Sequence, residues 1–321
     1  MSLMEEEIRY PSSKGKSTVT ATLWHYGEAP PRAIIHIVHG MGEQMDWYEE
    51  FAHFMAAYGF AVCGSDLPGR NKTGREQSGS YTRKGRMHML LDIRSLYLQM
   101  KRRFPRVPYI LLGHGLGALV VRLYASEYGR ELGAVIFSGM PSKTHIGRTG
   151  IFLNRVYMHL LGDRSTPITL WNRTLRGFSK KSKTLEAKYD WLSRDDEMVH
   201  RFAQRSEASL LYTIGGVNEV WDFLQDATKK ARIKKIPVNL PIYLFSGTMD
   251  PVGRYGKGVQ RFYNQLLCYG KKNVTLRLYH GGRHEMLHEV NRDEVYKNVV
   301  DWLDGVLREI EVSPESIDFE T

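Results

Sequence analysis

Three short stretches of the chain hold residues that could do chemistry together. They are Gly113-His114-Gly115-Leu116-Gly117, then Asp250 and, nearer the end, His284. Each follows a short apolar run, so each is expected just past the carboxyl end of a strand, where open α/β sheets place their sites. A glycine-flanked turn, an acid and a histidine in this order are the parts of a nucleophilic acyl-transfer site. The central residue of the turn is Gly115, however, which offers no side-chain oxygen.

The same turn also matches a dinucleotide-binding fingerprint, Gly113-x-Gly115-x-x-Ala118, between a strand-like run and a helix-like run. Two features count against a nucleotide. The turn follows two complete strand–helix units, and the next strand ends in Phe137-Ser138-Gly139, without the acidic residue that would bind the ribose. We therefore expect no nucleotide cofactor.

The stretch His284-Glu285-Met286-Leu287-His288 matches the zinc motif H-E-x-x-H, in which both histidines lie on one helical face. The preceding Gly281-Gly282-Arg283 favours a loop or a helix start. Glu294 and Glu309 are available as a third ligand, but nothing in the sequence singles either out. Because the motif is short and the chain has 12 histidines, we expect no metal site.

The order of elements around these stretches is typical of a parallel sheet with helices on both faces. From Arg32 onward we predict strands at 33–38, 60–64, 109–112, 134–138, 241–245 and 274–279, and helices at 47–58, 87–104, 116–128, 220–230, 255–269 and 294–308. Met1-Ser2-Leu3 is given no structural weight. The acidic tail from Glu309 is expected to be loosely held.

The alternation of strands and helices breaks between residues 141 and 215. We interpret 141–215 as a helical cap inserted into a core formed by 1–140 and 216–321. Residues 141–210 hold 13 Lys/Arg against 7 Asp/Glu, which is much of the chain's net charge of +10. This basic segment predicts weak, salt-sensitive contact with an anionic membrane surface; the alternative is a solvated basic face. No nucleic-acid motif accompanies it, so no nucleic-acid partner is expected.

The composition is that of a globular protein of the cytoplasm. The 321 residues are 42% hydrophobic, enough for one large α/β domain with a sizeable core. No apolar run is long enough to span a bilayer, and the acidic start MSLMEEEIRY lacks the apolar region of a signal peptide. Cys63 and Cys268 lie in apolar surroundings and are expected to be buried free thiols.

Further motifs surround the three stretches. They are His39-Gly40-Met41-Gly42, Tyr48-x-x-Phe51-Ala52, Gly59-Phe60-x-Val62, Asp66, Gly113-His114-x-x-Gly117, Gly247-x-x-Asp250-Pro251 and Gly282-x-His284-Glu285. Over about residues 20–305 the chain thereby resembles the monoacylglycerol lipase and lysophospholipase group of α/β-hydrolases, of the serine aminopeptidase S33 type. The stretch 189–195 also resembles bacterial members named lysophospholipases. The resemblance implies an α/β-hydrolase fold with a helical cap, where the insertion is predicted.

The resemblance also implies the mechanism and the role of each site residue. In such proteins a serine stands at position 115, His284 takes its proton, and Asp250 orients the histidine. The backbone N–H groups of Met41 and Leu116 would form the oxyanion hole. The implied substrate is a small, lipid-like carboxylic ester such as a lysophospholipid or monoacylglycerol. No cofactor is implied.

Two departures from the family pattern affect this interpretation. Asp66 leads into Leu67-Pro68-Gly69-Arg70-Asn71 instead of a glycine-histidine-glycine turn, and Gly115 stands where the family has serine. Glycine relaxes the strained backbone of such an elbow, but no acyl-enzyme can form on it. The chain as written is therefore predicted to be inactive or severely impaired.

Two hypotheses explain the missing serine. The first is a catalytic parent, a serine ester hydrolase in which Gly115 is an inactivating substitution. The second is a natural pseudo-hydrolase that keeps the pocket to bind a lipid-like ligand. The presence of both Asp250 and His284 favours the first. Ser138 and Ser246 are the nearest other hydroxyls, but we do not expect a relocated nucleophile. His39 and His114, which flank tight turns, are expected to be structural.

Overall fold

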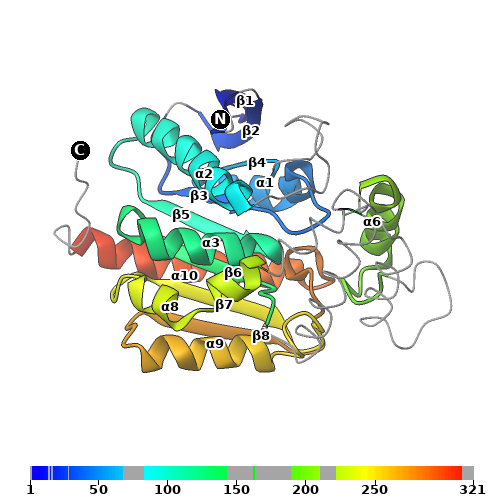
Figure 1. The fold of residues 1–321 in the computed structure, drawn as a ribbon. Coiled ribbons are helices and arrows are strands. Elements are labelled where there is room, and N and C mark those ends of the chain that lie inside the picture. Colours follow the sequence, from blue (N-terminus) through cyan, green and yellow to red (C-terminus); the bar gives the residue numbers. More distant parts are fainter. Residues whose placement is uncertain are drawn as a thin grey trace.

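An eight-stranded sheet runs through the computed structural model (Figure 1), with the strand order β1-β2-β4-β3-β5-β6-β7-β8. The structure describes residues 2–13, 15, 17–27, 29–67, 83–142, 162, 189–209 and 222–312, without the side chains of 83–85 and 205–209. The strands are β1 (Leu3–Pro11), β2 (Thr18–Tyr26), β3 (Ile34–Val38), β4 (Ala61–Ser65), β5 (Tyr109–His114), β6 (Ala134–Ser138), β7 (Ile242–Gly247) and β8 (Val274–Tyr279).

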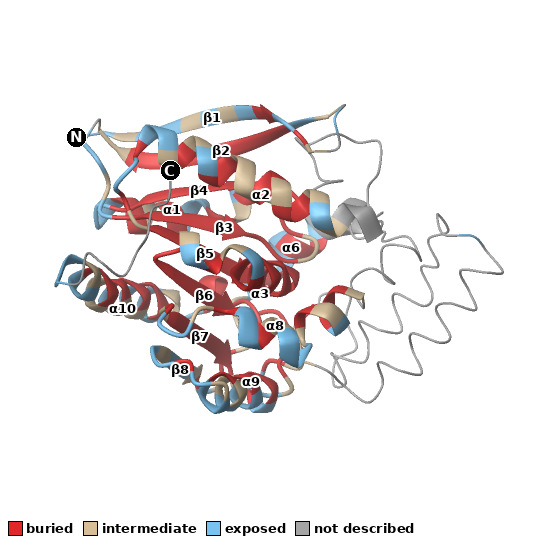
Figure 2. Cartoon of the chain, turned by 60° about the vertical axis from the view of Figure 1, so that its left-hand side comes forward, coloured by how far each residue is buried: buried red, intermediate tan, exposed pale blue. Residues whose placement is uncertain are grey.

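The strands from β3 to β8 are all parallel, as the sequence predicts. Every residue of β3, β5, β6 and β7 is buried, which explains their uninterrupted apolar character. Figure 2 shows these central strands buried along their length. Because all six strands point the same way, the loops that follow β3, β5, β7 and β8 meet at one edge of the sheet.

Two strands precede the predicted elements. β1 and β2 form an antiparallel ribbon, with Leu3 opposite Tyr26 and Pro11 opposite Thr18. β2 then pairs antiparallel with β4, so the sheet is mostly but not wholly parallel. Giving Leu3 no structural weight was wrong, because its backbone begins β1 and pairs with that of Tyr26.

Helices cover both faces of the sheet. The described helices include α1 (Glu49–Ala57), α2 (Arg83–Arg103), α3 (Leu116–Tyr128), α6 (Asp196–Ser209), α8 (Lys230–Lys235), α9 (Lys257–Cys268) and α10 (Arg292–Val312), with short 3-10 turns η1 (Met45–Tyr48), η4 (Gly129–Glu131) and η6 (Met286–His288). Side chains of α1 and α10 share one apolar core with alternate strand residues. Side chains of α2, α3, α8 and α9 pack in a second core on the other face.

The predicted elements differ from the structure in several bounds, and α10 continues to Val312, so the tail from Glu309, expected to be loosely held, begins as helix. The predicted helix 47–58 is divided into η1 and α1. The predicted helix 220–230 ends near 227, and α8 follows as a separate helix. Strand β5 continues through His114, two residues beyond the predicted end at Leu112, so the turn begins at Gly115 itself.

The two cysteines differ in exposure. Cys63 on β4 is buried, as expected, whereas Cys268 is exposed. The buried residues of α9 are Gly258, Val259, Phe262 and Leu266, and Cys268 at the end of the helix lies off that face. The expectation that both thiols are buried was therefore wrong for Cys268.

The predicted cap falls mostly outside the described residues. Of the range 141–215, the structure describes 141–142, 162 and 189–209, so the cap boundaries and the membrane contact of its basic residues stay predictions. Within the described part, Phe202 of α6 packs edge-on against Trp47 and Tyr189. No described helix has both the length and the apolar character needed to cross a bilayer.

Candidate functional site

The turn between β5 and α3 has the backbone of a tight elbow. Gly115 has a φ of 51° and a ψ of −117°, a conformation that side-chain-bearing residues rarely adopt. A Cβ on Gly113 would lie 2.5 Å from the carbonyl oxygen of Gly117, and a Cβ on Gly117 would lie 1.9 Å from that of Val38. The two outer glycines are thus required by close backbone packing, whereas space for a side chain exists at Gly115.

That space lies against His284. A Cβ built on Gly115 would be 3.4 Å from His284 Nε2 and 3.6 Å from Gly40 Cα, both ordinary contact distances. The N–H of Gly115 donates to the carbonyl oxygen of Ser138 at 3.0 Å, which ties the elbow to the end of β6. The structure therefore brings the elbow, the histidine and the loop after β3 together, as the sequence predicts.

His284 is held on its other side by Asp250. The Nδ1 atom of His284 lies 3.1 Å from Asp250 Oδ1. Asp250 also accepts hydrogen bonds from the Ser246 hydroxyl and the Val252 N–H. Burial alone would raise the pKa of Asp250, but the neighbouring His284 and these hydrogen bonds lower it below its ordinary value. The carboxylate thus stays ionised beside the imidazole.

The two backbone N–H groups predicted for an oxyanion hole lie next to position 115. Leu116 is the first residue of α3, and its N–H is one of the four that find no partner inside a helix. Met41 follows Gly40, whose Cα lies beside the space at Gly115. This placement agrees with the predicted roles of Met41 and Leu116 but does not test them.

A second buried polar cluster lies directly behind His284, and sequence reasoning missed it. The ring of His114 packs against that of His284, with centroids 4.7 Å apart. His114 Nε2 lies 2.9 Å from Glu285 Oε1 and 3.5 Å from Glu43 Oε1. Glu43 Oε2 accepts hydrogen bonds from the Gly40 N–H and from a tyrosine hydroxyl of η1. The contacts of His114 with Glu43 and Glu285 are long-range, so only the proximity of Glu43 to the predicted oxyanion loop could have signalled them.

The charges of this cluster are strongly coupled. Burial disfavours the cation of His114, but Glu285 and Glu43 outweigh it and raise the pKa of His114 to about 9. Burial, together with the charge of Glu285, raises the pKa of Glu43 to about 7. Burial opposes ionisation of Glu285 as well, yet His114 and His288 hold its pKa well below the usual range. Around pH 8 the cluster is therefore a buried imidazolium between two carboxylates.

The same contacts argue against a relocated nucleophile at Ser138. Ser138 Oγ lies 3.0 Å from His114 Nδ1, and His114 contacts Glu285, an arrangement that superficially matches a serine–histidine–acid triad. A general base must accept a proton, however, and the raised pKa keeps His114 protonated at neutral pH. Ser138 is also fully buried, so we assign it a structural role.

The H-E-x-x-H motif does not form the helical pair of a zinc protease. Met286–His288 is a single 3-10 turn, and His288 contacts Glu285 through Nδ1 and the Trp47 carbonyl oxygen through Nε2. Among the described residues, the side chains of His114, His284 and Glu285 could together hold an ion, because their possible ligand atoms lie within 4.8 Å of one another. Each of these three already has a hydrogen-bonding partner, as described above.

The segment before α6 lies against the histidine loop. The N–H groups of His284 and Glu285 donate to the carbonyl oxygens of Trp191 (3.3 Å) and Leu192 (2.7 Å). The indole of Trp191 lies 5.2 Å from the His284 ring. Arg194 pairs with the buried Glu289. The segment 189–194 therefore fixes one side of the site and places an aromatic surface beside the histidine.

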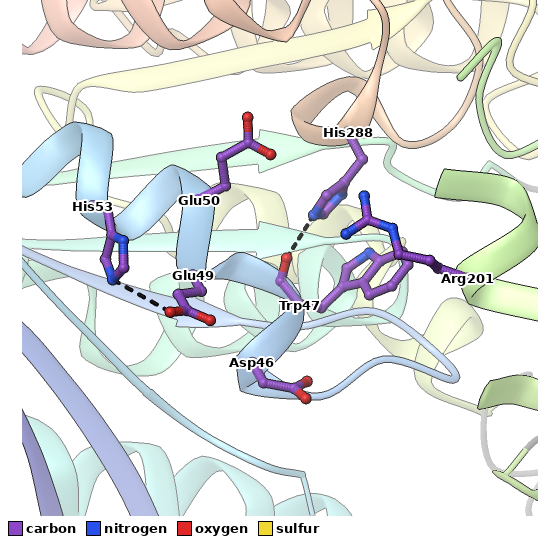
Figure 3. Close-up of a pocket in the computed structure, with 7 residues that line it drawn as sticks. All are labelled: Asp46, Trp47, Glu49, Glu50, His53, Arg201 and His288. Carbon is purple, nitrogen blue, oxygen red and sulfur yellow. Dashed lines mark hydrogen bonds and ion pairs between the residues drawn. The ribbon is translucent and has the colours of Figure 1, made fainter. Parts of the chain in front are cut away.

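A surface pocket of about 360 Å³ lies beside His288 (Figure 3). It is lined by Asp46, Trp47, Glu49, Glu50, His53, Arg201 and His288. His288 is the residue that belongs both to this pocket and to the hydrogen-bonded cluster, because its Nδ1 contacts Glu285. The pocket thus connects the cluster with solvent.

Comparison with solved structures identifies the class of protein. The chain is similar to a thermostable carboxyl esterase from Bacillus coagulans, with a TM-score of 0.84 and 26% identity over 94% of this chain and 99% of that one. A monoglyceride lipase of Saccharomyces cerevisiae, at 16% identity, shares the fold with a TM-score of 0.70 over 94% of each chain. The fold is therefore that of an α/β-hydrolase.

Sequence comparison identifies the family. The chain is 25% identical over 278 residues to a monoglyceride lipase homologue of monkeypox virus, covering 84% of this chain and 87% of the relative. It is 23% identical over 282 residues to a monoacylglycerol lipase of Mycolicibacterium smegmatis, covering 86% and 89%. The family model of the serine aminopeptidases S33 matches residues 29–291. The chain belongs to this hydrolase family, with distant monoglyceride lipase relatives.

Proposed function

We propose that the scaffold is that of a serine hydrolase for lipid-like carboxylic esters, of the monoacylglycerol or lysophospholipid kind. In this proposal Gly115 occupies the position of the nucleophilic serine, Asp250 and His284 complete the triad, and the chain as written is inactive or severely impaired. The monoglyceride lipases and the esterase to which the chain is similar support the ester substrate class.

The observation that carries this proposal is the space at Gly115. The backbone is strained for any side chain, yet a Cβ would meet nothing closer than His284 Nε2 at 3.4 Å. If Gly115 served only to allow close packing, nothing would require a hydrogen-bonded acid–histidine pair to face the place that its Cβ would occupy. A serine there has a base within reach, whereas glycine leaves the base without a proton to take.

With serine at 115 the reaction would proceed in two steps, formation of an acyl-serine and its hydrolysis. The hydroxyl oxygen attacks the ester carbonyl carbon while His284 Nε2 takes its proton, and the negative oxygen is stabilised by the N–H groups of Met41 and Leu116. His284 then returns the proton to the departing alcohol, leaving an acyl-serine. Water activated by His284 hydrolyses this ester, releasing the fatty acid and restoring the hydroxyl.

The decisive experiment restores the hydroxyl with Gly115→Ser and uses Gly115→Ala as the matched control. Both add a Cβ in the same strained backbone, but only serine adds a nucleophile. We expect hydrolysis of nitrophenyl esters, monoacylglycerols or lysophospholipids to rise by about 10³-fold or more in the serine variant alone. Adding His284→Ala to the serine variant should remove that gain.

The alternative is a non-catalytic protein that binds a lipid-like ligand, and the absence of a side chain at Gly115 is the observation that favours it. No ester hydrolysis by a folded Gly115→Ser variant, together with retained binding of a non-hydrolysable ether analogue of monoacylglycerol, would establish this alternative. Equal activity in the serine and alanine variants would contradict the assignment of position 115.

A further inference from the structure

We propose that Glu43, His114 and Glu285 form a charge clamp that holds the oxyanion-hole loop against the nucleophile elbow and the histidine loop. Glu43 and Glu285 are then positioning residues for ester hydrolysis. This inference rests on the proposed function, since it assigns the clamp a role in that reaction.

The three members of the clamp come from the three loops that any such reaction must align. Glu43 follows the His39-Gly40-Met41-Gly42 loop, His114 is the last residue of β5 before the elbow, and Glu285 follows His284. All three side chains are 2% exposed. The β3–β5 ladder ends at the pair Val38 and Gly113, and beyond it no backbone hydrogen bond among the described residues joins these loops, so the clamp connects them through side chains.

Glu43 acts on the oxyanion loop through Gly40. Its carboxylate accepts the Gly40 N–H at 2.7 Å, which fixes the His39–Gly40 peptide, one peptide before the one that carries the Met41 N–H. A Cβ on Gly40 would lie 2.3 Å from Glu43 Oε1 and 2.9 Å from His114 Cδ2, so the backbone packs directly on the clamp. A displacement of Glu43 must therefore move the Met41 N–H relative to the space at residue 115.

The charges explain why this arrangement holds in a buried site. Two ionised carboxylates at this separation repel each other, and the imidazolium of His114 between them offsets that repulsion. The groups facing the clamp from neighbouring elements are Tyr48 on Glu43 and His288 on Glu285. The rings of His284 and His114 are also in contact, and Asp250 adds to the charge that favours the His114 cation.

The clamp can exchange protons with solvent although it is buried. His288 lines the surface pocket of Figure 3 and contacts Glu285 at 3.2 Å, and Glu285 contacts His114 at 2.9 Å. This row of hydrogen bonds connects the pocket with the centre of the site. The protonation of the clamp therefore follows the pH of the medium, and the rate should follow it too.

The test uses the Gly115→Ser protein with Glu43→Gln or Glu285→Gln added. Both changes keep the shape and remove one charge, and Glu49→Gln at the exposed rim of the pocket is the control. We expect kcat for a nitrophenyl ester to fall about 10–100-fold with KM changed less than about threefold, because oxyanion stabilisation is lost in the transition state. Melting curves establish that each variant is folded.

The pH profile separates a positioning role from a merely structural one. A group that acts as a general base can lose rate only on the acidic side of a pH profile, so an alkaline limb must come from another group. We expect an alkaline limb from His114, and we expect Glu285→Gln to move it to lower pH by about one unit or more. An unchanged kcat in both clamp variants, or an alkaline limb that does not move, would overturn the proposal.

A second measurement distinguishes failure of the clamp from failure of the proposed function. In the chain as it stands, with Gly115, hydrogen exchange of the Gly40 amide reports on the oxyanion loop without any activity. We expect Glu285→Gln, which does not touch Gly40, to speed that exchange about tenfold, and Glu49→Gln to leave it unchanged. Unchanged exchange in Glu285→Gln would overturn the clamp even if Gly115→Ser proves to be an esterase.

Discussion

Two buried histidines lie ring against ring in this protein, and their partners differ. His284 contacts one acid, Asp250, through Nδ1, and its Nε2 faces the space at Gly115. His114 has acceptors on both nitrogens, with Ser138 at Nδ1 and a carboxylate at Nε2. The first arrangement leaves a nitrogen for chemistry, whereas the second uses both nitrogens to join loops.

The difference shows that residue type does not decide the role of a buried histidine. The two rings are 4.7 Å apart and share the same surroundings. The two histidines differ in the number and charge of the groups around them. Two carboxylates, Glu285 and Glu43, raise the pKa of His114 and so stabilise its protonated form. Changing those partners or their protonation therefore tests the contrast between the two histidines.

The largest effect on stability is expected from His114→Ala. Removing this cation leaves Glu43 and Glu285 facing each other in a buried site, which should cost about 3–5 kcal/mol of unfolding free energy. His284→Ala should cost only about 1–2 kcal/mol, because Asp250 keeps its hydrogen bonds to Ser246 and Val252. Urea unfolding of the two variants in parallel measures the contrast. Equal losses would show that the two histidines are energetically alike.

The next effect is a loss of stability on the alkaline side. The pKa of His114 is raised from 6.5 to about 9 and that of Glu43 from 4.5 to about 7, so the folded chain holds more protons than the unfolded chain between these values. Stability from His114 is therefore fully present below about pH 6.5 and is lost as the pH rises through 9, by about 2–3 kcal/mol.

Melting temperatures recorded between pH 7 and pH 9 test this linkage, with His114→Gln as the variant and His53→Gln, at a half-buried surface residue, as the control. We expect the decline to be shallower in His114→Gln, because only the Glu43 contribution remains there. The pKa values of Asp250 and Glu285 are lowered in the folded chain, so the stability that these two carboxylates contribute is lost on acidification, below about pH 4. An identical decline in all three proteins would remove His114 as its cause.

The smallest effect concerns another buried cation, Arg122 of α3, which pairs with no acid among the described residues. Within the described part of the chain, its Nε and Nη2 atoms make no hydrogen bond, and its guanidinium lies 3.8 Å from the centre of the Phe262 ring. Burial lowers the pKa of Arg122 to about 9. We expect Arg122→Met to stabilise the fold by about 1–2 kcal/mol, measured by urea unfolding. A loss above about 1 kcal/mol would mean that the contact with Phe262 outweighs the cost of burying the charge.

The fold was predictable where the apolar pattern was unambiguous. Continuous apolar runs separated by helical periods gave the strands from β3 to β7 and the helices between them, because strands covered on both faces carry few polar residues. The strand β1 was not predicted, because three consecutive glutamates, Glu5-Glu6-Glu7, interrupt the alternation of apolar and polar residues that indicates a strand. β2 carried a readable signal in its β-branched and aromatic residues from Thr18 to Tyr26.

The site likewise has one part that the sequence predicts and another part that it does not. The order of Gly115, Asp250 and His284 along the chain was enough to predict that these positions meet, because all three follow parallel strands. The clamp could not be predicted, because Glu43 and Glu285 come from distant loops. Glu285 also falls within the H-E-x-x-H match, a pattern that points to a metal and not to a contact with His114. Their contact depends on side-chain burial and charge, which leave no periodic trace in the sequence.

The acidic first strand has a consequence for how copies of this chain meet. β1 is the outermost strand of the sheet, and such an edge can pair with the edge of another molecule. It carries the consecutive Glu5-Glu6-Glu7, and Glu6 is drawn inward by Arg103, which lowers the pKa of Glu6 to about 2. Two such edges approaching each other would bring like-charged carboxylates together. The ribbon that begins the sheet thereby also protects it from aggregation.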